Sequence, residues 1–180
     1  MGKYFPYLKL EKIIAGEKEQ GKRVVLTGGA FDVTVHPGHI YLFRKCKELG
    51  DILVVNVVND ERVRMYKGET RPILGAYERA IYVGELESVD YVTIHPSVKQ
   101  GPTIDLAILI KPHVIVRSTE RPWLDEDRQR LMELMGYVPE LINIERTDDI
   151  SSTEIIEALR KRAGERFAKG TLGANDIDFG

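Results

Sequence analysis

The sequence is poor in cysteine, in long apolar runs and in excess charge of either sign. Its 180 residues include one cysteine, Cys46, which excludes an internal disulfide and a zinc site built from several cysteines. No apolar run approaches the roughly 18 residues that a membrane-spanning helix needs. Residues 1–6 lack the apolar stretch of a signal peptide. We therefore expect a cytoplasmic protein.

Positive and negative charges are nearly balanced, with 26 Lys and Arg against 28 Asp and Glu, a net charge of −2. Nucleic-acid binders usually carry a clear basic excess, so this balance argues against a DNA- or RNA-binding module. It leaves room for a local basic pocket that binds one small anion. Hydrophobic residues make up 43% and charged residues 30%, which is typical of a single soluble globular domain at this length.

Apolar, β-rich segments alternate with helix-like segments along most of the chain. Residues 52–58 form a near-continuous apolar run, which is typical of a strand covered on both faces. The alternation predicts an α/β, Rossmann-like three-layer fold with a five-stranded, mostly parallel sheet and helices on both faces. The expected strands are 23–27, 52–58, 89–94, 113–117 and 141–144, and the expected helices are 38–49, 77–86, 104–110, 124–135 and 151–161.

Two terminal segments are expected to lie outside the core domain, which we place at residues 23–162. Residues 1–22 are expected to form an N-terminal extension with a short helix, because Leu10, Ile13 and Ile14 would share one helical face. Residues 163–180 contain glycines and little periodicity, which predicts a mobile tail or an oligomer arm. Folds of this class bind ligands at the carboxyl ends of the strands, so the site is expected in the loops there.

The segment from Gly28 to His39 reads GGAFDVTVHPGH and joins the first strand to the first helix of the domain. A Gly-Gly turn at 28 and 29 would let the backbone approach a phosphate, and a helix N-terminus offers free amide donors. His36 and His39, two of only four histidines, could point at one anion. The alternatives are two surface histidines beside a tight turn, or a zinc site that lacks its third and fourth ligands nearby.

A second polar segment, residues 145–154, precedes the last predicted helix and reads ERTDDISSTE. Ser151 or Ser152 followed by Glu154 is close to a capping box, which by itself explains hydroxyls at a helix start. Three consecutive hydroxyls with Arg146 just upstream are more than a cap requires. They would suit phosphate oxygens at a helix N-terminus.

Together the two segments resemble the nucleotidyltransferase superfamily that shares the HxGH signature. Residues 36–39 fit HxGH, and residues 146–153 resemble the RTEGISTT signature of cytidylyltransferases acting on glycerol phosphate, choline phosphate and ethanolamine phosphate. The resemblance spans roughly residues 23–160. The chain departs from the family in three places. One more residue separates Asp32 from His36 than in the FDxxH pattern, and Asp148-Asp149 replaces Glu-Gly in the second signature. Residues 117–123 stand where the family often has a Gly-Asp-Asp-Trp-like loop.

The resemblance implies an enzyme that transfers a nucleotidyl group, with CMP favoured, from CTP or ATP to a small phosphorylated acceptor and releases pyrophosphate. The acceptor phosphate would attack the α-phosphorus in line, so positioning and charge stabilisation would dominate catalysis. Mg²⁺ would travel on the nucleotide phosphates, because it keeps waters and few protein ligands. No nucleic-acid or membrane partner is expected, and a homodimer is compatible with related enzymes.

The resemblance also implies catalytic roles. His36 and His39 would stabilise the transition state, and Lys67, in the mobile-looking stretch 65–69, would clamp the α-phosphate and the acceptor. Arg79 would contact phosphate or acceptor. A solvated loop lysine and a helix-surface salt bridge are the alternatives for Lys67 and Arg79.

Other residues are expected to bind the nucleotide or to support the site. Asp32 and Asp60 are candidates for structural or metal-shell carboxylates. Trp123 is a candidate for stacking on a base, although a packed aromatic is favoured. The expected nucleotide-binding residues are Gly29, Ala30, Phe31, Asp32, Gly38, Arg146, Thr147, Ile150, Ser151, Ser152 and Thr153.

Alternatives remain open within and beyond this superfamily. The GGAFD turn and the divergent loop at 117–123 are compatible with an ATP-using enzyme. Such an enzyme could be a sugar-phosphate adenylyltransferase of the ADP-heptose-synthase type, an archaeal-type FAD synthetase or a phosphopantetheine adenylyltransferase. A non-catalytic nucleotide sensor is the alternative of another class, because a fold does not fix a function.

Overall fold

The structure, a computed structural model, describes residues 3–32, 35–96, 98, 101–119, 123–145 and 152–168. A 3₁₀ helix at Tyr7–Lys9 leads into the first α-helix of the chain. The elements that follow alternate between strands and helices for most of the chain. They are α1 (Leu10–Glu19), β1 (Val24–Gly29), α2 (Pro37–Lys47), β2 (Ile52–Val58), α3 (Asp60–Lys67), α4 (Ala76–Gly84), β3 (Tyr91–His95), α5 (Pro102–Ile110), β4 (Val114–Ser118), α6 (Asp125–Met135), β5 (Glu140–Ile144) and α7 (Ser152–Ala168).

The five strands form one sheet in the order β3-β2-β1-β4-β5, and every pair of neighbours is parallel. This arrangement confirms the predicted α/β, Rossmann-like class. The central strands β1 and β2 pair from Val24 with Ile52 through Gly29 with Val57. All seven residues of β2 are buried, as its apolar run predicts for a strand covered on both faces.

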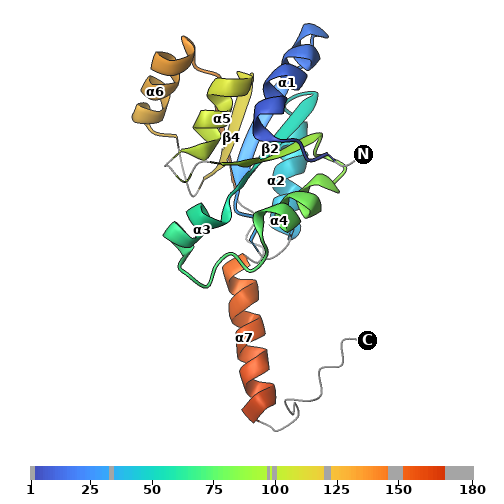
Figure 1. The fold of residues 1–180 in the computed structure, drawn as a ribbon, viewed down its shortest axis with the longest axis vertical. Helices are drawn as coiled ribbons and strands as arrows, with labels where there is room; N and C mark the ends of the chain where they lie inside the picture. The colour runs from blue at the N-terminus through green and yellow to red at the C-terminus, as the bar shows by residue number, and fades with distance from the viewer. Residues whose placement is uncertain are drawn as a thin grey trace.

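Helices cover both faces of the sheet (Figure 1). They enclose two large apolar clusters, one on each face. On one face, α2 and α4 pack against the sheet, with Phe43, Cys46 and Val83 buried in the shared core. On the other face, α5 lies over β1, β2 and β3 and contacts α1 and α6. Leu10 and Ile14 of α1 are fully buried in this second cluster. Residues of one strand therefore alternate between the two clusters.

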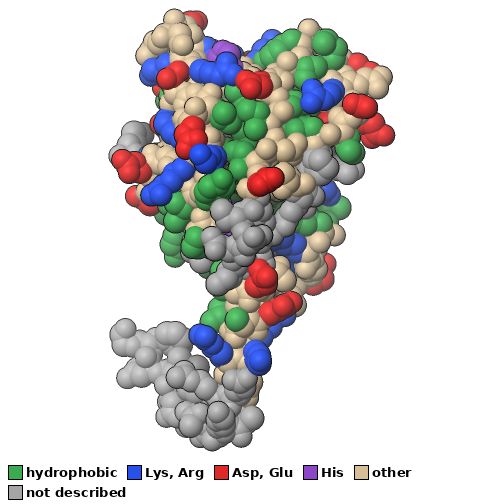
Figure 2. Space-filling model, turned by 180° about the vertical axis from the view of Figure 1, so that it is seen from behind, with side chains coloured by type: hydrophobic (Ala, Val, Ile, Leu, Met, Phe, Trp, Pro, Cys, Tyr) green, Lys and Arg blue, Asp and Glu red, His purple; other side chains and the backbone are tan. Residues whose placement is uncertain are grey.

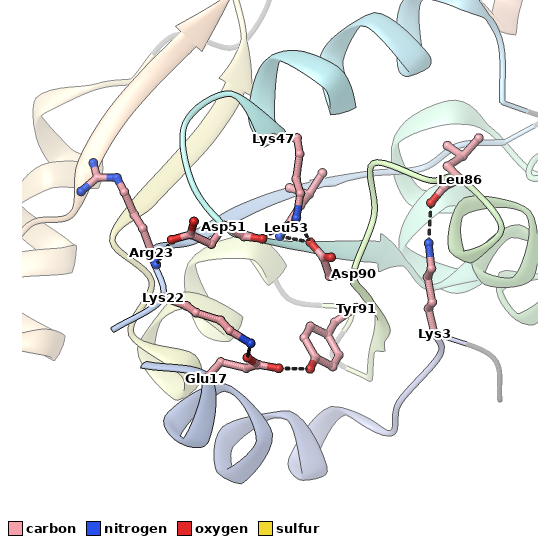
Figure 3. Close-up of polar contacts among 10 residues, drawn as sticks. All are labelled: Lys3, Glu17, Lys22, Arg23, Lys47, Asp51, Leu53, Leu86, Asp90 and Tyr91. Carbon is pink, nitrogen blue, oxygen red and sulfur yellow. Dashed lines mark hydrogen bonds and ion pairs between the residues drawn. The ribbon is translucent and has the colours of Figure 1, made fainter. Parts of the chain in front are cut away.

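The N-terminal segment packs against the domain core. Its predicted helix is present as α1, and the backbone before it extends the sheet. The Phe5 N–H donates to the Val92 carbonyl at 2.8 Å, and the Val92 N–H donates to the Lys3 carbonyl at 2.9 Å. Figure 3 shows two side-chain links in the same region: Glu17 accepts from the Tyr91 hydroxyl, and Lys3 donates to the Leu86 carbonyl.

Three predicted boundaries were wrong. Gly28 and Gly29 are the last paired residues of β1 rather than a turn, because their N–H and C=O groups continue the ladder with β2. Residues 65–67 are the last turn of α3 rather than a loop. That helix is capped by the Asn59 side chain, which accepts from the Arg62 N–H at 2.8 Å. Helix α7 continues past 161 to Ala168, and Figure 1 shows it running away from the sheet.

The described surface carries mixed charge. On the face shown in Figure 2, Lys and Arg side chains are interspersed with Asp and Glu rather than gathered in one broad field. This distribution agrees with the near balance of charges in the composition. None of the helices within the described residues is long and apolar enough to cross a membrane.

Candidate active site

The carboxyl end of β1 marks the position where a ligand is expected. In the order β3-β2-β1-β4-β5, the chain builds outward from β1 through β2 and β3 on one side, then crosses over to add β4 and β5 on the other, so the strand order reverses between β1 and β4. Ligands of open parallel sheets bind beyond the carboxyl ends of the strands at such a switch point. The chain leaves β1 through residues 30–32 and enters α2 at Pro37. The predicted HxGH segment therefore starts a helix at the expected place.

His36 and His39 lie together at the N-terminus of α2. His36 is the N-cap residue, and the two residues form a capping box in which each side chain faces the other's backbone N–H. The His39 Nδ1 lies 3.5 Å from the His36 nitrogen. Their rings stack with centroids 3.7 Å apart, at 29° to each other. The helix dipole and the first-turn amides, including that of Gly38, add positive potential beside this ring pair.

Phe31 shapes the turn that precedes the histidines. Its φ angle is +49°, a left-handed conformation that costs energy for a bulky residue. The Phe31 ring is buried and meets the His39 ring edge to face at 5.0 Å. A Cβ atom on Gly29, the last residue of β1, would lie 3.0 Å from the same ring, a tight approach that favours glycine at that position. Ala30, the last residue before the turn, is also buried.

Asp32 is fully buried and engaged by the protein. Its carboxylate forms an ion pair with Arg71 and accepts from the Ile73 N–H at 2.8 Å. The Arg71 side chain is itself only 9% exposed. Asp32 therefore ties the β1 turn to the segment between α3 and α4. Of the two roles predicted for its carboxylate, these contacts support the structural one.

Arg79 occupies the interior at the base of the same region. Its guanidinium donates to the carbonyls of Ala30, Val58 (2.7 Å) and Leu74 (3.0 Å), and to the Asp60 carboxylate at 2.7 Å. The Arg79 side chain is 0% exposed. It thus joins the ends of β1 and β2 to the start of α3. The predicted contact with phosphate stays untested, and the contacts seen here belong to a positioning residue.

Lys67 is the last residue of α3 and is exposed. Eight residues of α-helix span about 12 Å, so the lysine stands well clear of the strand end from which α3 begins. Gly68 follows it with a φ of +93° and ends the helix. The contact of Lys67 with the α-phosphate and the acceptor stays a prediction.

The second signature falls mostly outside the described residues. The structure does not describe six of its residues, namely Arg146, Thr147, Asp148, Asp149, Ile150 and Ser151. Ser152 is the first residue of α7, and Thr153 is exposed in its first turn. The expected helix is therefore present directly after the signature. The phosphate contacts expected from these residues remain predictions.

Trp123, in the loop after β4, is held by contacts with β5, with β4 and with the second apolar cluster. Its indole N–H donates to the Ile142 carbonyl at 3.3 Å, and the Arg117 guanidinium lies 3.7 Å from the centre of its ring. Arg117 also pairs with Asp127 at 2.6 Å. Trp123 packs against the second apolar cluster. This structure therefore agrees with the packed aromatic rather than with a ring free to stack on a base.

Sequence reasoning did not single out His95, which ends β3. The His95 side chain is 3% exposed. Its ring meets Tyr7 edge to face at 4.7 Å, and its Nε2 lies 3.9 Å from an Asp105 oxygen. Burial and the Asp105 charge raise the pKa of Tyr7 above its ordinary value of 10.0. A histidine at the carboxyl end of a predicted strand was the signal that could have found this residue.

Two further observations bear on the location and chemistry of the site. A hollow of 530 Å³, lined by residues such as Lys18, Arg23 and His113, lies at the amino ends of β1, β4 and β5, the opposite end of the strands from the histidine pair. Among the described residues, no group of three or more His, Cys, Asp or Glu side chains could hold a metal ion.

Comparison with known proteins places the chain in a class. The α/β fold and the matches together are those of a nucleotidyltransferase domain. The cytidylyltransferase-like family model matches residues 26–158, and the chain belongs to that family.

Curated relatives include the bifunctional protein HldE of Pelobacter propionicus, 35% identical over 85% of this chain and 30% of the relative. The protein of the same name from Geobacter sulfurreducens is 36% identical over 87% of this chain and 31% of the relative. The chain thus spans about three-tenths of the length of these relatives.

Two solved structures share the fold. One is the lipopolysaccharide core biosynthesis protein from Thermoplasma volcanium, with a TM-score of 0.62 and 29% identity over 71% of this chain and all of that one. The other is pantoate-beta-alanine ligase from Francisella tularensis, with a TM-score of 0.56 and 14% identity over 89% of this chain and 77% of that one. The second likeness concerns the fold alone.

Proposed function

We propose that this protein transfers an adenylyl group from ATP to a sugar phosphate and releases pyrophosphate. The stacked His36 and His39 pair at the N-terminus of α2 is the observation that carries nucleotidyl transfer. The choice of ATP and a sugar phosphate rests on the relatives named HldE, of the ADP-heptose synthetase kind, and on the archaeal lipopolysaccharide core biosynthesis protein.

The proposed reaction needs no covalent enzyme intermediate. An acceptor phosphate oxygen forms a bond to the α-phosphorus while the bond from that phosphorus to the bridging oxygen of the β-phosphate breaks. Pyrophosphate leaves with the electron pair, and no proton moves because the acceptor is ionised at neutral pH. Catalysis then consists of holding the two reactants in line and stabilising charge on the phosphates.

The predicted site residues, within and outside the described part of the chain, have the following roles in this proposal. His36 and His39 donate hydrogen bonds to the triphosphate, supported by the positive end of the α2 dipole and the Gly38 amide. Lys67 reaches the α-phosphate and the acceptor from the end of α3. Arg79 and Asp32 hold the β1 turn that aims the histidines. Arg146, Ser151, Ser152 and Thr153 bind the outer phosphates at the start of α7.

Magnesium fits this proposal as a companion of the nucleotide. The Asp32 carboxylate is buried against Arg71 and is not presented to an ion, and the partly exposed Asp60 carboxylate is paired with Arg79. The nucleotide phosphates and water would therefore supply its ligands, as Mg²⁺ prefers. When bound, the ion would neutralise charge on the triphosphate.

CTP is the second candidate donor, favoured by the likeness of residues 146–153 to the cytidylyltransferase signature. The deciding experiment measures pyrophosphate release with ATP or CTP against hexose and heptose 1-phosphates, glycerol phosphate, ethanolamine phosphate and FMN. We expect the highest kcat/KM with ATP and a sugar phosphate. A preference for CTP and glycerol phosphate would replace this proposal with the cytidylyltransferase.

Thermal shift with each nucleotide separates an enzyme from a sensor. A bound nucleotide stabilises the fold in proportion to the logarithm of its concentration over its Kd. Stabilisation by ATP without pyrophosphate release from any acceptor would indicate a non-catalytic nucleotide sensor.

A further inference from the structure

A row of polar residues crosses the face of the sheet that lies under α5. Gly28 of β1, Asn56 of β2 and Thr93 of β3 are partners in register, so they share this face near the carboxyl ends of their strands. Asn56 and Thr93 are both 0% exposed. Every other residue of β2 is Ile, Leu or Val. Asn56 is therefore a polar exception in an apolar strand.

The polar side-chain atoms of Asn56 and Thr93 have no hydrogen-bond partner among the residues that the structure describes. The Asn56 amide oxygen and nitrogen and the Thr93 hydroxyl are buried, and none of the three has a hydrogen bond to any part of the chain that the structure describes. A buried polar group without a partner destabilises a fold, whereas valine would fill the same strand positions without that cost. The row is thus poorly explained by stability and well explained by a ligand.

Thr103 connects this row to the surface. It lies in the first turn of α5, which packs over all three strands, and it is partly exposed. A Cβ atom on Gly28 would lie 2.7 Å from the Thr103 Oγ1 and 3.2 Å from the Asn56 Cβ. Because Gly28 has no side chain, Thr103 fills this space, and rotation of its side chain would open a path to Asn56.

We propose that Asn56, Thr93 and Thr103 form a subsite for hydroxyl groups of the acceptor. A sugar hydroxyl both donates and accepts a hydrogen bond, and a primary amide beside threonine hydroxyls offers both kinds of partner. The subsite adjoins the carboxyl end of β1, which also leads to the histidine turn. A sugar held there would present its phosphate toward that turn.

The charges around the row favour a neutral group over a second anion. Asn56, Thr93 and Thr103 are uncharged, and the acidic residue of the first α5 turn is Asp105. A phosphate at this helix end would face the Asp105 carboxylate, which Arg130 pairs at 3.2 Å. Hydroxyls avoid that repulsion. This inference rests on the proposed function, because it assigns specificity to the same site.

Thr93→Val and Thr27→Val make a matched test. Both threonines are buried in the sheet, but Thr27 faces the opposite cluster and its hydroxyl donates to the Val116 carbonyl at 3.1 Å. With a hexose 1-phosphate as the probe, we expect Thr93→Val to raise the KM of the acceptor about tenfold, the effect of one neutral hydrogen bond. The KM of ATP should not change. Thr27→Val should lower the melting temperature and leave the KM of the acceptor as it is.

Asn56→Leu and deoxy sugars sharpen the test. Asn56→Leu should raise the KM of the acceptor and leave the fold as stable or more stable, since an unpartnered amide is removed. Among monodeoxy analogues of the probe, one should have a kcat/KM about tenfold lower than that of the probe with the wild type. With Asn56→Leu, that analogue and the probe should have the same kcat/KM. Unchanged acceptor kinetics in both Asn56→Leu and Thr93→Val would overturn the subsite while leaving the proposed function intact.

Binding without turnover separates the two proposals. Calorimetry measures the affinity of the hexose 1-phosphate in the presence of a non-hydrolysable ATP analogue. Binding that Thr93→Val weakens, in a protein that releases no pyrophosphate, would keep the subsite and reject the enzyme. A wild type that neither binds nor uses sugar phosphates, but uses another acceptor, would overturn both.

Discussion

The Arg79 guanidinium and the Asp60 carboxylate form an ion pair of 2.7 Å in which the arginine side chain is 0% exposed and the aspartate 35%. The same guanidinium donates to the carbonyl groups of Ala30 and Val58, the residues at the ends of β1 and β2. One side chain therefore fixes the separation of two strand ends and the start of α3. The geometry of the site depends on this contact.

Replacing Arg79 should destabilise the folded protein. Arg79→Gln leaves buried carbonyl groups unpaired and should lower the free energy of unfolding by about 3 kcal/mol or more. Arg79→Lys should not restore it, because a single ammonium cannot replace the planar fork. Urea unfolding at neutral pH measures both. Arg64→Gln, at an exposed position of α3, is the control and should change little. Full stability together with lost turnover would instead indicate direct contact with substrate.

Loss of either histidine of the α2 pair should abolish most of the turnover. His36→Ala and His39→Ala each remove a preorganised donor, and kcat should fall about 10²-fold or more. Pyrophosphate release gives the rate, and circular dichroism confirms that the variant is folded. His113→Ala serves as the control, since His113 accepts from the Val24 N–H at the other end of the sheet. Near-normal kcat in both site variants would remove the histidines from the mechanism.

Glu17 should make the free energy of unfolding depend on pH. Hydrogen bonds from Lys22 and then from Tyr91 hold the pKa of Glu17 below its ordinary value of 4.5. Because the pKa is lower in the folded state, this stabilisation is present above pH 4.5 and is lost as the pH falls through the folded pKa. Glu17→Gln should cost about 1–2 kcal/mol at neutral pH and less in acid.

Urea midpoints at neutral pH and below pH 4.5 test this expectation for Glu17. The difference in urea midpoint between the wild type and Glu17→Gln should be smaller at the acidic pH than at neutral pH. Glu19→Gln, at an exposed position of the same helix, should follow the wild type at both pH values. A constant gap would show that the contact does not depend on the charge of Glu17.

The only cysteine should report unfolding. Cys46 is fully buried in α2, and burial raises the pKa of its thiol to about 12. The thiolate is the reactive form, so a maleimide should not label the folded protein at pH values near neutral. Labelling should appear in urea with the same midpoint as the loss of helical signal. Rapid labelling without denaturant would show that α2 opens locally.

The sequence predicted the class of fold because its signals were local. The all-buried run at β2 and the HPGH start of α2 each contain their own evidence, and both lie where they were expected. Helix α3 was missed although Asn59 is a good N-cap, because the charged residues after it resemble a solvated loop. The strand pairing of Gly28 and Gly29 was missed because their glycines also suit a turn.

Long-range contacts were beyond the reach of the sequence. Arginine is rarely buried, so the enclosed position of Arg79 could not be inferred from its place in a helix. Asn56 and Thr93 become neighbours only once the register of β2 and β3 is fixed. The subsite that we propose depends on this register, which no single segment of the chain encodes.

The pairing of the N-terminal segment with β3 has a consequence for solubility. β3 is an outer strand, and such a strand offers unpaired backbone groups to other chains. Hydrogen bonds from Val92 to Lys3 and from Phe5 to Val92 occupy part of that edge. Removing the first five residues should therefore expose unpaired backbone groups along β3. The shortened protein should aggregate while its helices are still folded.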